Sequence, residues 1–541
     1  MTDISKPLAT RREWIGLAVL ALACVLYAMD LTVLHLAVPK LSAALQPSSA
    51  QLLWIIDIYG FLVAGSLITM GTLGDRIGRR RLLMIGAAAF GAISVVAAFS
   101  TSAEMLIASR ALMGLAGATL APSTLSLIFN MFRNPRERSI AIGVWISAFS
   151  AGSAIGPVLG GVLLEYFWWG SVFLLALPVM GLLLILGPRV LPEYHAPGAG
   201  RLDLLSAGMS LVAILAMITG LKQIAQDGIG PFPVAAIGLG LLVGALFLRR
   251  QRRLADPLID LALFRVPTFN VSLATNVLTI FIAVGYFLFI AQYLQLVLVL
   301  TPLQAGLWSL PSAVGFIVGS NVAPKFIYRY RPALILGPCL AIAALGLLML
   351  TQIGATSGLA IVVGASVLIS LSLAPVFSLT TELIVGSAPP ERAGAASGIS
   401  ETGAELGGAL GIAILGSVGT AIYRGQLAER LPAGTTAEAA AVARDTLGAA
   451  VALAETLPQE LSQPLLEVSR EAFVRGVHAV AAIAAIVAIG AALLVLVALR
   501  REPAHGEAPA ELTHGEGSGG AGHAAPIDAA PGGAVADKHK E

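Results

Sequence analysis

Five ionisable side chains lie well inside stretches of sequence that are otherwise apolar. Asp30, Asp57, Glu401 and Glu405 are acids, and Arg110 is basic. An ionised group in hydrocarbon costs roughly 2.5–3.5 kcal/mol even on lenient scales, so each of these residues needs a reason to be retained. Carboxyls in such surroundings can take up and release protons or hold a cation. The alternative is that they are polar contacts between packed helices.

The acids fall into two pairs by position. A helix rises 1.5 Å per residue, which puts Asp30 and Asp57 about 10 Å and about 9 Å from the outer ends of successive helices. We therefore expect a proton site and a cation site that face one cavity. Glu401 and Glu405 are one turn apart on a shared helix face, near mid-membrane. Two carboxylates that close disfavour simultaneous ionisation, so one is expected to hold a proton until a cation competes for the site.

Arg110 and several aromatic side chains complete the candidate chemistry. Arg110 either neutralises a carboxylate and so fixes the helix packing, or it supports proton transfer. Aromatic faces attract cations by about 2 kcal/mol or more when desolvated, so they could build the cation site. Trp54 and Trp308 lie near outer helix ends and are expected at the membrane interface. The candidates for the cavity, with lipid-facing placement as the alternative, are Tyr59, Trp145, Phe149, Tyr286 and Tyr293.

The elements that position these residues are predicted to be membrane-spanning helices. Hydrophobic residues make up 57% of the 541 residues and charged residues only 12%, about half the share in soluble domains. The chain is therefore expected to be an all-α polytopic membrane protein. A span needs about 20 apolar residues. Such runs predict fourteen spans, at 14–37, 51–73, 82–100, 103–130, 139–163, 168–188, 203–221, 231–248, 268–298, 302–324, 332–351, 357–385, 393–422 and 476–499.

The distribution of Lys and Arg predicts how the spans are oriented. With the N-terminus inside, 25 of the 33 basic residues fall on the inner side and seven on the outer side, as the positive-inside rule requires. Both termini are therefore expected in the cytoplasm. The net charge of +2 does not indicate a nucleic-acid partner, and none is expected. Cys24 and Cys339 lie in apolar spans, so no disulfide framework is indicated.

Glycines recur at every fourth position within the fifth predicted span. Gly152, Gly156 and Gly160 line one helix face and let a neighbouring helix approach closely. Pro157 lacks a backbone donor and would bend or loosen the helix. Ordinary small-residue packing is the alternative, but a Gly-Pro step within the span favours a helix that moves.

A turn motif lies between the second and third predicted spans. Residues 71–81 read GTLGDRIGRRR, in which glycines suit a helix end and the acid can pair with arginines or cap the next helix. This stretch resembles the cytoplasmic loop signature of the major facilitator superfamily. The C-terminal counterpart at 319–331 lacks the acid, so no equal role is expected there. The resemblance implies a gating role for Gly71, Asp75, Arg76, Gly78 and Arg79.

Further stretches strengthen this resemblance and narrow it. Arg110 with Gly114 and Gly117 is similar to a signature of the superfamily's fourth span, and the glycine stripe is similar to its antiporter motif. Residues 30–39, DLTVLHLAVP, resemble the first-span motif of the fourteen-span drug:proton antiporters, with His35 where Asn is usual. Together with LWIIDIY at 53–59, these residues resemble the quaternary-ammonium efflux branch of that family.

The resemblance implies a domain organisation and a mechanism. Two six-helix bundles, at 14–188 and 268–499, would flank a linker at 189–267 that carries inserted helices seven and eight. The bundles would alternate in access, exchanging an outward-moving drug for inward-moving protons. The resemblance places proton coupling on Asp30, Arg110 and Glu405. It also places Glu401 and Glu405 in cation recognition. Together with Asp57 and the five aromatic candidates, which were chosen above for their chemistry, they form the predicted substrate site.

Outside the spans the sequence predicts three segments. A cytoplasmic N-terminus at 1–13 precedes the first span, and an extracytoplasmic loop at 424–475, rich in Ala, Glu and Leu, could contain short amphipathic helices. The tail at 500–541 is rich in Gly, Ala, Pro and His and is expected to be disordered in the cytoplasm. Its histidines are widely spaced, so a solvated tail is favoured over a metal site, and no metal or cofactor is expected.

Three functions compete. The first is proton-driven export of lipophilic cations, such as quaternary ammonium compounds and dyes, from a bacterial cell membrane. The alternative is a dedicated proton-coupled exporter of an endogenous metabolite or antibiotic. A sensor or an enzyme is poorly supported, because the sequence has no metal-ligand cluster, nucleophile elbow or phosphate-binding loop. We expect a monomer in the lipid bilayer.

Overall fold

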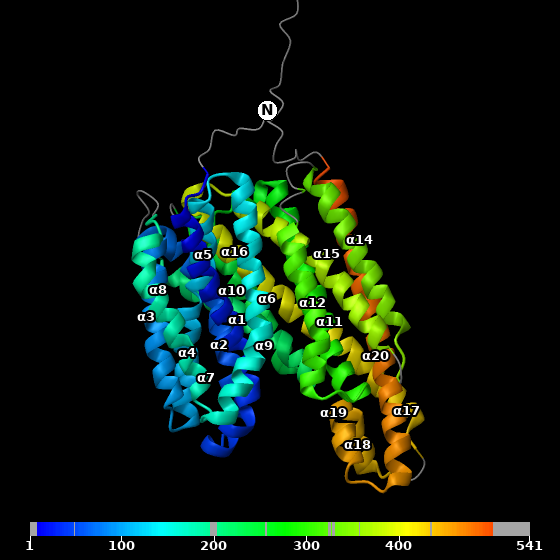
Figure 1. Cartoon of the computed structure of the whole chain (residues 1–541). Helices are drawn as coiled ribbons and strands as arrows, with labels where there is room; N and C mark the ends of the chain where they lie inside the picture. Colours follow the sequence, from blue (N-terminus) through cyan, green and yellow to red (C-terminus); the bar gives the residue numbers. More distant parts are fainter. Residues whose placement is uncertain are drawn as a thin grey trace, which may run out of the picture.

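The computed structural model shows a helical chain of the predicted fold class. It describes residues 8–47, 49–194, 203–254, 257–322, 326, 330–355, 358–432 and 435–500, and none of these residues forms a β-strand. Within them, twelve helical segments are long and apolar enough to cross a membrane. Two further long helices, α6 (Pro135–Tyr166) and α12 (Pro302–Val322), run alongside those segments (Figure 1). The all-α polytopic fold is confirmed, and the count of fourteen spans stays a prediction.

The N-terminal half packs its helices around one apolar core that includes the fully buried Leu20 and Phe90. Local sequence sets where several of these helices begin. The side-chain oxygens of Thr10, Ser102 and Asn134 accept hydrogen bonds from the first backbone N–H groups of α1, α4 and α6. The helices of this half are α1 (Arg11–Leu45), α2 (Ser49–Ile77), α3 (Arg79–Ala98), α4 (Ala103–Gly117), α5 (Leu120–Met131), α6, α7 (Ser171–Leu174) and α8 (Ala176–Val190).

The C-terminal half has a core of its own, in which Ile282, Leu336 and Ala484 are fully buried. Figure 1 shows the two halves side by side. The elements of this half are α11 (Pro267–Gln292), η2 (Tyr293–Val297), α12, α14 (Pro332–Met349), η3 (Leu350–Gln352), α15 (Leu359–Gly386), η4 (Pro390–Arg392), α16 (Ala393–Gly411), η5 (Ile412–Gly416), α17 (Ser417–Arg430), α18 (Ala437–Asp445), α19 (Leu447–Ala454) and α20 (Gln459–Ala498).

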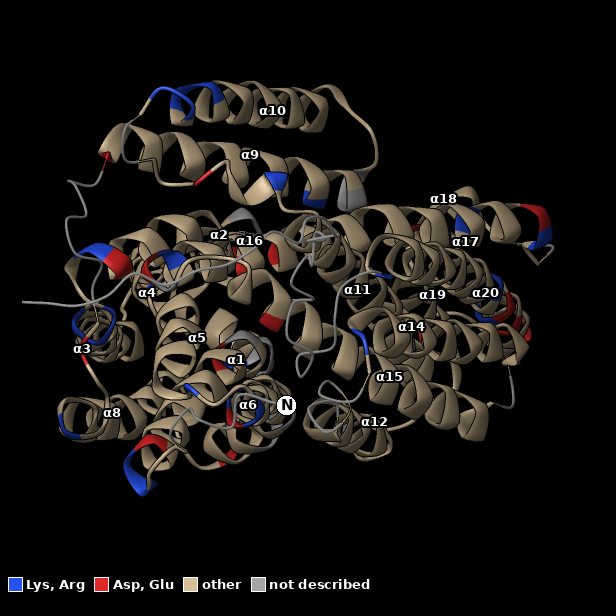
Figure 2. Cartoon of the chain, turned by 90° about the horizontal axis from the view of Figure 1, so that it is seen from above, with Lys and Arg blue, Asp and Glu red and all other residues tan. Residues whose placement is uncertain are grey.

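The linker between the halves contains α9 (Leu204–Asp227), α10 (Pro231–Gln251) and the short η1 (Leu263–Arg265). Helices α9 and α10 pack on each other, and α9 lies against α2 and α16 (Figure 2). A third apolar cluster fills this contact with residues from both halves and from α9. Asp203 caps α9 and pairs with Arg250 of α10 at 2.8 Å, which holds the pKa of the Asp203 carboxyl at about 2.

The bundle has two distinct ends. We call the end at which the described chain begins the N-terminal face, and it lies at the top of Figure 1. At the opposite end α17 and α20 extend beyond the other helices and carry α18 and α19 (Figure 1). Tyr423 donates to the carbonyl of Ala443, and Arg424 pairs with Asp445 at 2.9 Å, so these helices form a compact extension. This extension falls in the segment predicted as an extracytoplasmic loop.

The glycine stripe of α6 lies against α1. A methyl group on Gly152 would overlap the backbone carbonyl of Val25, and one on Gly160 would lie 2.8 Å from the Val33 side chain. Close approach of the two helices therefore requires glycine at these positions. Helix α6 continues through Pro157 without a break, and the side chain of Pro157 lies outside the described part of the structure.

This packing predicts a stability difference between two glycines of one helix. Gly152→Leu forces a side chain against main-chain atoms of α1 that cannot rotate away, so it is expected to cost about 1–3 kcal/mol, as overpacking does. The matched control is Gly161→Leu, because Gly161 is exposed and has open space around its α-carbon. Thermal unfolding of the purified variants in detergent measures the difference. Equal melting temperatures would contradict the close contact.

Candidate functional site

An ion pair lies at the centre of the N-terminal half. Arg110 Nη1 on α4 is 2.6 Å from Asp30 Oδ2 on α1, and the two side chains are 1% and 11% exposed. Arg110 also donates to the backbone carbonyl of Ile55 at 3.3 Å. A charge pair this buried holds its helices in register, since loss of either partner leaves the other uncompensated. Of the two interpretations of Arg110, neutralisation of a carboxylate is the one visible in the geometry.

Tyr59 covers this ion pair from α2. The Arg110 guanidinium lies 4.5 Å from the Tyr59 ring centroid, and Tyr59 is fully buried. The motif glycines of α4 make room for it: a methyl group on Gly114 would lie 2.6 Å from the Tyr59 carbonyl, and one on Gly117 would lie 3.0 Å from its hydroxyl. The spacing of Arg110, Gly114 and Gly117 therefore places all three residues against Tyr59, with the arginine on its ring and the glycines leaving room for it.

Four aromatic rings continue from this point across the N-terminal half. The Tyr27 ring centroid lies 6.2 Å from Tyr59 and 5.7 Å from Phe149. Phe149 in turn lies 4.7 Å from Trp145, whose indole N–H donates to Thr124. We call Tyr27, Tyr59, Trp145 and Phe149 the aromatic row. The structure thus groups three predicted candidates for the cavity with Tyr27, another aromatic residue that the sequence offers for the cation site.

Glu401 and Glu405 extend from α16 of the other half toward this row. Both carboxylates lie within electrostatic range of Tyr27, and Glu405 also of Tyr59. Both side chains are partly buried. Glu401 Oε1 is buried without a hydrogen-bond partner, and within the described residues neither acid forms an ion pair. A buried carboxylate without a partner is stabilised either by taking up a proton or by binding a cation.

Asp57 does not share the surroundings of Asp30. It pairs with Lys222 on α9, with Asp57 Oδ1 2.6 Å from Lys222 Nζ. Asp57 is two residues from Tyr59, about 200° around the helix, so it faces α9 while Tyr59 faces Arg110. The expectation that the two aspartates face one cavity is therefore not met in this conformation. The small pocket at Asp30 lies between α1, α7 and α8 instead.

Two aromatic candidates lie apart from the aromatic row. Tyr293 is fully buried in η2, where its hydroxyl donates to the Gly354 carbonyl at 2.7 Å. Tyr286 lines a small pocket within the C-terminal half, with Ser312 and Trp308. The structure does not bring these tyrosines to the acids of α16. Their assignment to the substrate site stays a prediction.

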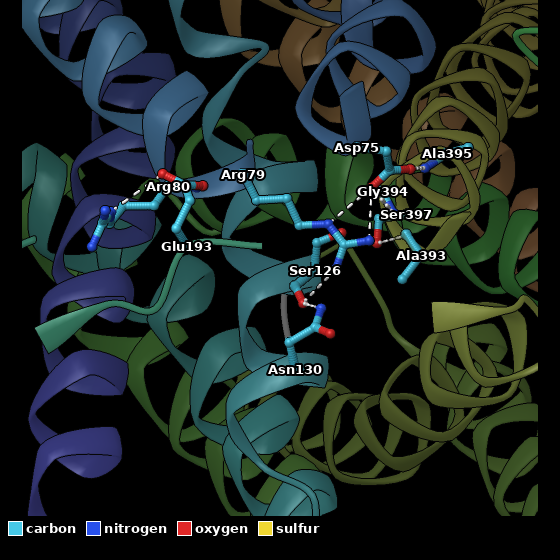
Figure 3. Close-up of polar contacts among 10 residues, drawn as sticks. All are labelled: Asp75, Arg79, Arg80, Ser126, Asn130, Glu193, Ala393, Gly394, Ala395 and Ser397. Carbon is cyan, nitrogen blue, oxygen red and sulfur yellow. Dashed lines mark hydrogen bonds and ion pairs between the residues drawn. The ribbon is translucent and has the colours of Figure 1, made fainter. Parts of the chain in front are cut away.

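The turn motif joins the two halves at the N-terminal face (Figure 3). Asp75 accepts hydrogen bonds from the backbone N–H groups of Gly394 at 3.1 Å and Ala395 at 3.0 Å. These are the unpaired donors of the first turn of α16, and the positive end of a helix favours a carboxylate there. Arg79 pairs with Asp75 at 2.7 Å and contacts the carbonyl of Ser126. We call this set of contacts the Asp75 latch.

The other motif residues support this latch. Gly71 packs so closely on Gly394 that a methyl group would overlap the Gly394 carbonyl. Gly78 has a φ of 110°, which only glycine adopts readily, and this turn positions Arg79. Arg76 lies partly buried in the last turn of α2. Of the residues that the resemblance implicated in gating, Gly71 and Asp75 contact the opposite half directly, and Arg79, which follows the Gly78 turn, pairs with Asp75.

A second acid closes the same face. Glu382 on α15 is 2% exposed and accepts a hydrogen bond from Ser139 Oγ at 2.7 Å, near the start of α6. Arg138 lies 3.9 Å away as its counter-charge. Its position near the inner end of a predicted span suggests an interfacial side chain, but the structure buries it between the halves. Because Glu382 lies within an apolar stretch of sequence, a buried contact between helices could have been predicted for it.

Several sequence predictions fall outside the described part of the structure. The side chain of His35 is one, and the tail at 501–541 with its histidines is another. Among the described residues, no group of three or more His, Cys, Asp or Glu side chains is arranged to hold a metal. Lys222 was missed as a site residue, although a lysine beside apolar residues at a span end was a usable signal.

Together the fold and the site define a polytopic membrane protein whose two halves enclose acids and aromatic rings and meet through a latch at one face. This is the organisation of a transporter. A family model of the Major Facilitator Superfamily matches residues 20–412, and the chain belongs to that superfamily. Its family and fold are those of transporters rather than enzymes.

The chain is similar to named transport proteins over most of its length. It is 43% identical over 490 residues to the multidrug efflux pump LfrA of Mycolicibacterium smegmatis, covering 91% of this chain and 97% of that one. It is 37% identical over 470 residues to the methyl viologen resistance protein SmvA of Salmonella typhimurium, covering 86% and 93%. The human organic anion transporter MFSD10 has the same fold, with a TM-score of 0.56, 15% identity and coverage of 89% and 100%.

The latch predicts how readily the N-terminal face opens. Asp75→Asn removes the charge from hydrogen bonds that are worth about 1.5–3 kcal/mol, so opening should become roughly tenfold more frequent. A cysteine at Ser397, which is fully buried behind the latch, reports on it in a Cys24→Ser, Cys339→Ser background. The rate of modification by a water-soluble maleimide is the measurement.

The matched control for the latch is Glu193→Gln. Glu193 pairs with Arg80 at 3.4 Å beside the same turn, but this pair stays within the N-terminal half. Its loss should leave the maleimide rate at Ser397→Cys unchanged. A rate for Asp75→Asn equal to that of the control would show that the latch does not hold the halves together.

Proposed function

We propose that this protein is a proton-coupled antiporter that exports lipophilic cations from a bacterial cytoplasm across the plasma membrane. Quaternary ammonium compounds and cationic dyes are the expected class of substrate. The observation that carries the proposal is the position of Glu401 and Glu405, which lack ion-pair partners among the described residues and lie beside the aromatic row. Carboxylates and aromatic faces together bind a desolvated cation.

Competition for these carboxyls supplies the coupling. A protonated carboxyl pair offers no net charge to a cation, whereas a deprotonated pair attracts one strongly in a medium of low dielectric constant. Proton binding and cation binding therefore oppose each other at one place. The Asp30–Arg110 ion pair packs on Tyr59, which is part of the aromatic row beside these carboxyls. This position favours a role for Asp30 in proton transfer. The names of the relatives LfrA and SmvA support drug export as the outcome.

Alternating access requires that the halves close at one face at a time. At the N-terminal face the halves are joined by the last turns of α2 and α15 and the first turns of α16 and α6. Further along α6, Ser147 forms hydrogen bonds with Ser320 and Asn321 near the end of α12. With both termini in the cytoplasm, as the basic residues predict, this conformation is closed toward the cytoplasm. The bundles at 14–188 and 268–499 are the units that would rock, as a monomer of fourteen spans.

A dedicated exporter of one endogenous metabolite or antibiotic is the second candidate. The acids would serve protons in that case as well, so they do not exclude it. Breadth of substrate separates the two: the first function requires uptake of several unrelated cations into everted vesicles under an imposed pH gradient. Uptake restricted to a single compound would favour the second.

Loss of the buried aspartate should abolish coupling. Asp30→Asn alone leaves Arg110 buried without a counter-charge, which costs about 3–5 kcal/mol and endangers folding. The double variant Asp30→Asn/Arg110→Met removes both charges and is expected to fold. We expect it to lose pH-driven dye uptake by at least about tenfold while it still binds the dye. Full uptake by the folded double variant would remove Asp30 from proton coupling.

The acids of α16 should distinguish substrates by charge. Glu401→Gln or Glu405→Gln removes one of two adjacent carboxylates, so binding of a dication should weaken more than binding of a monocation, by roughly fivefold. Equilibrium binding of methyl viologen and tetraphenylphosphonium to the purified variants measures this. Equal loss for both probes, or no loss, would remove helix α16 from cation recognition.

A further inference from the structure

Lys222 on α9 brings a positive charge against α2. It belongs to the last turns of α9, where its ammonium lies 2.6 Å from Asp57 Oδ1 and 4.6 Å from the Phe61 ring centroid. Asp57 and Phe61 are one turn apart on α2. A carboxylate and an aromatic face are also what a lipophilic cation would require. Lys222 thus occupies a position built for positive charge.

The ammonium is also close to one acid of α16. Lys222 lies within electrostatic range of the Glu405 carboxyl, while Asp57 balances it from α2. The apolar cluster that holds α9 in this position draws on all three helices, with Phe61 from α2, Ile218 from α9 and Ile399 from α16. The lysine is therefore anchored between an acid of one half and an acid of the other.

Its degree of burial separates this pair from Asp30–Arg110. The Lys222 and Asp57 side chains are 29% and 24% exposed, against 1% and 11% for Arg110 and Asp30. A partly exposed pair can be reached and displaced by an incoming ion, whereas a fully buried pair cannot. Lys222 is thus placed to compete with a substrate, while Arg110 is fixed in the packing.

We propose that Lys222 is a specificity-determining residue that acts as the resident cation of the substrate site. Its ammonium neutralises Asp57 and repels a second positive charge near Glu405. The site would therefore favour monocations over dications, and α9, which lies outside the two six-helix bundles, would set this preference. The inference rests on the function proposed above and assigns to it a residue and a charge selectivity.

The first test removes the charge of Lys222 in the full-length protein in lipid nanodiscs. Tetraphenylphosphonium and methyl viologen are the monocationic and dicationic probes, measured by equilibrium binding at one pH. Lys222→Gln frees the Asp57 carboxylate and removes a like charge, so the dissociation constant for methyl viologen should fall roughly tenfold. That for tetraphenylphosphonium should change less than about threefold. Lys222→Arg keeps the charge and should behave as the wild type.

A second variant tests whether the charge itself is responsible. Asp57→Asn leaves the Lys222 ammonium unbalanced, so binding of both probes should weaken, and methyl viologen should weaken more. The double variant Asp57→Asn/Lys222→Gln is neutral again and should return both dissociation constants to within about threefold of the wild type. Rescue by the second substitution would not follow from a purely structural role for the pair.

The matched control breaks a different ion pair of α9, the one that joins it to α10. Arg250→Gln loosens α9 from α10 at Asp203, away from the acids of α16. This variant should change the dissociation constants for both probes by the same factor. If Lys222→Gln also shifts both probes equally, or if the double variant shows no rescue, Lys222 only anchors α9 and this inference is overturned. Failure of the wild type to bind either probe would overturn the proposed function as well.

Discussion

A charge surrounded by apolar helices must find a counter-charge, a proton or a ligand, and the arrangement of this protein follows from that constraint. Arg110 satisfies Asp30, and Lys222 satisfies Asp57. The two acids of α16 have no such partner among the described residues. In the proposed function, the carboxyls that the protein does not neutralise are the ones that bind protons and cations.

The same constraint works at the N-terminal face with a different partner. Asp75 is 5% exposed and is satisfied by Arg79 and by the first N–H groups of α16, which belong to the opposite half. Glu382 is satisfied by Ser139 of the opposite half. Separating the halves deprives both acids of donors, so the latch is strong only while the halves touch. Helix α16 carries the latch at its first turn and the unpaired acids two to three turns later, so one rigid element connects them.

Sequence alone predicted the elements whose signals are local. The fold class, the acids in apolar stretches, the turn at 71–81 and the glycine stripe of α6 all depend on composition or on spacing within one helix. Neutralisation of a carboxylate by Arg110 was one of two open interpretations, and the sequence did not show that Asp30 would be the partner. Lys222 was visible at a span end, but its partner could not be predicted, since the contact with Asp57 joins residues 165 positions apart through the packing of α9 on α2. Tyr286 was chosen for its residue type, and packing placed it in another part of the bundle.

Helices α9 and α10 lie outside the two halves, so their presence in the fold needs a physical reason. A helix that only filled space against lipid would need no charge, yet α9 brings an ammonium to the acid of α2 and near an acid of α16. Burying a lysine stem there is favourable only if its charge is met, and Asp57 meets it. The stem and the helix thus bring one positive charge to Asp57 and near Glu405 from outside the two halves. In the proposed alternating-access cycle, a charge held in this way would act on the substrate without being carried by either half.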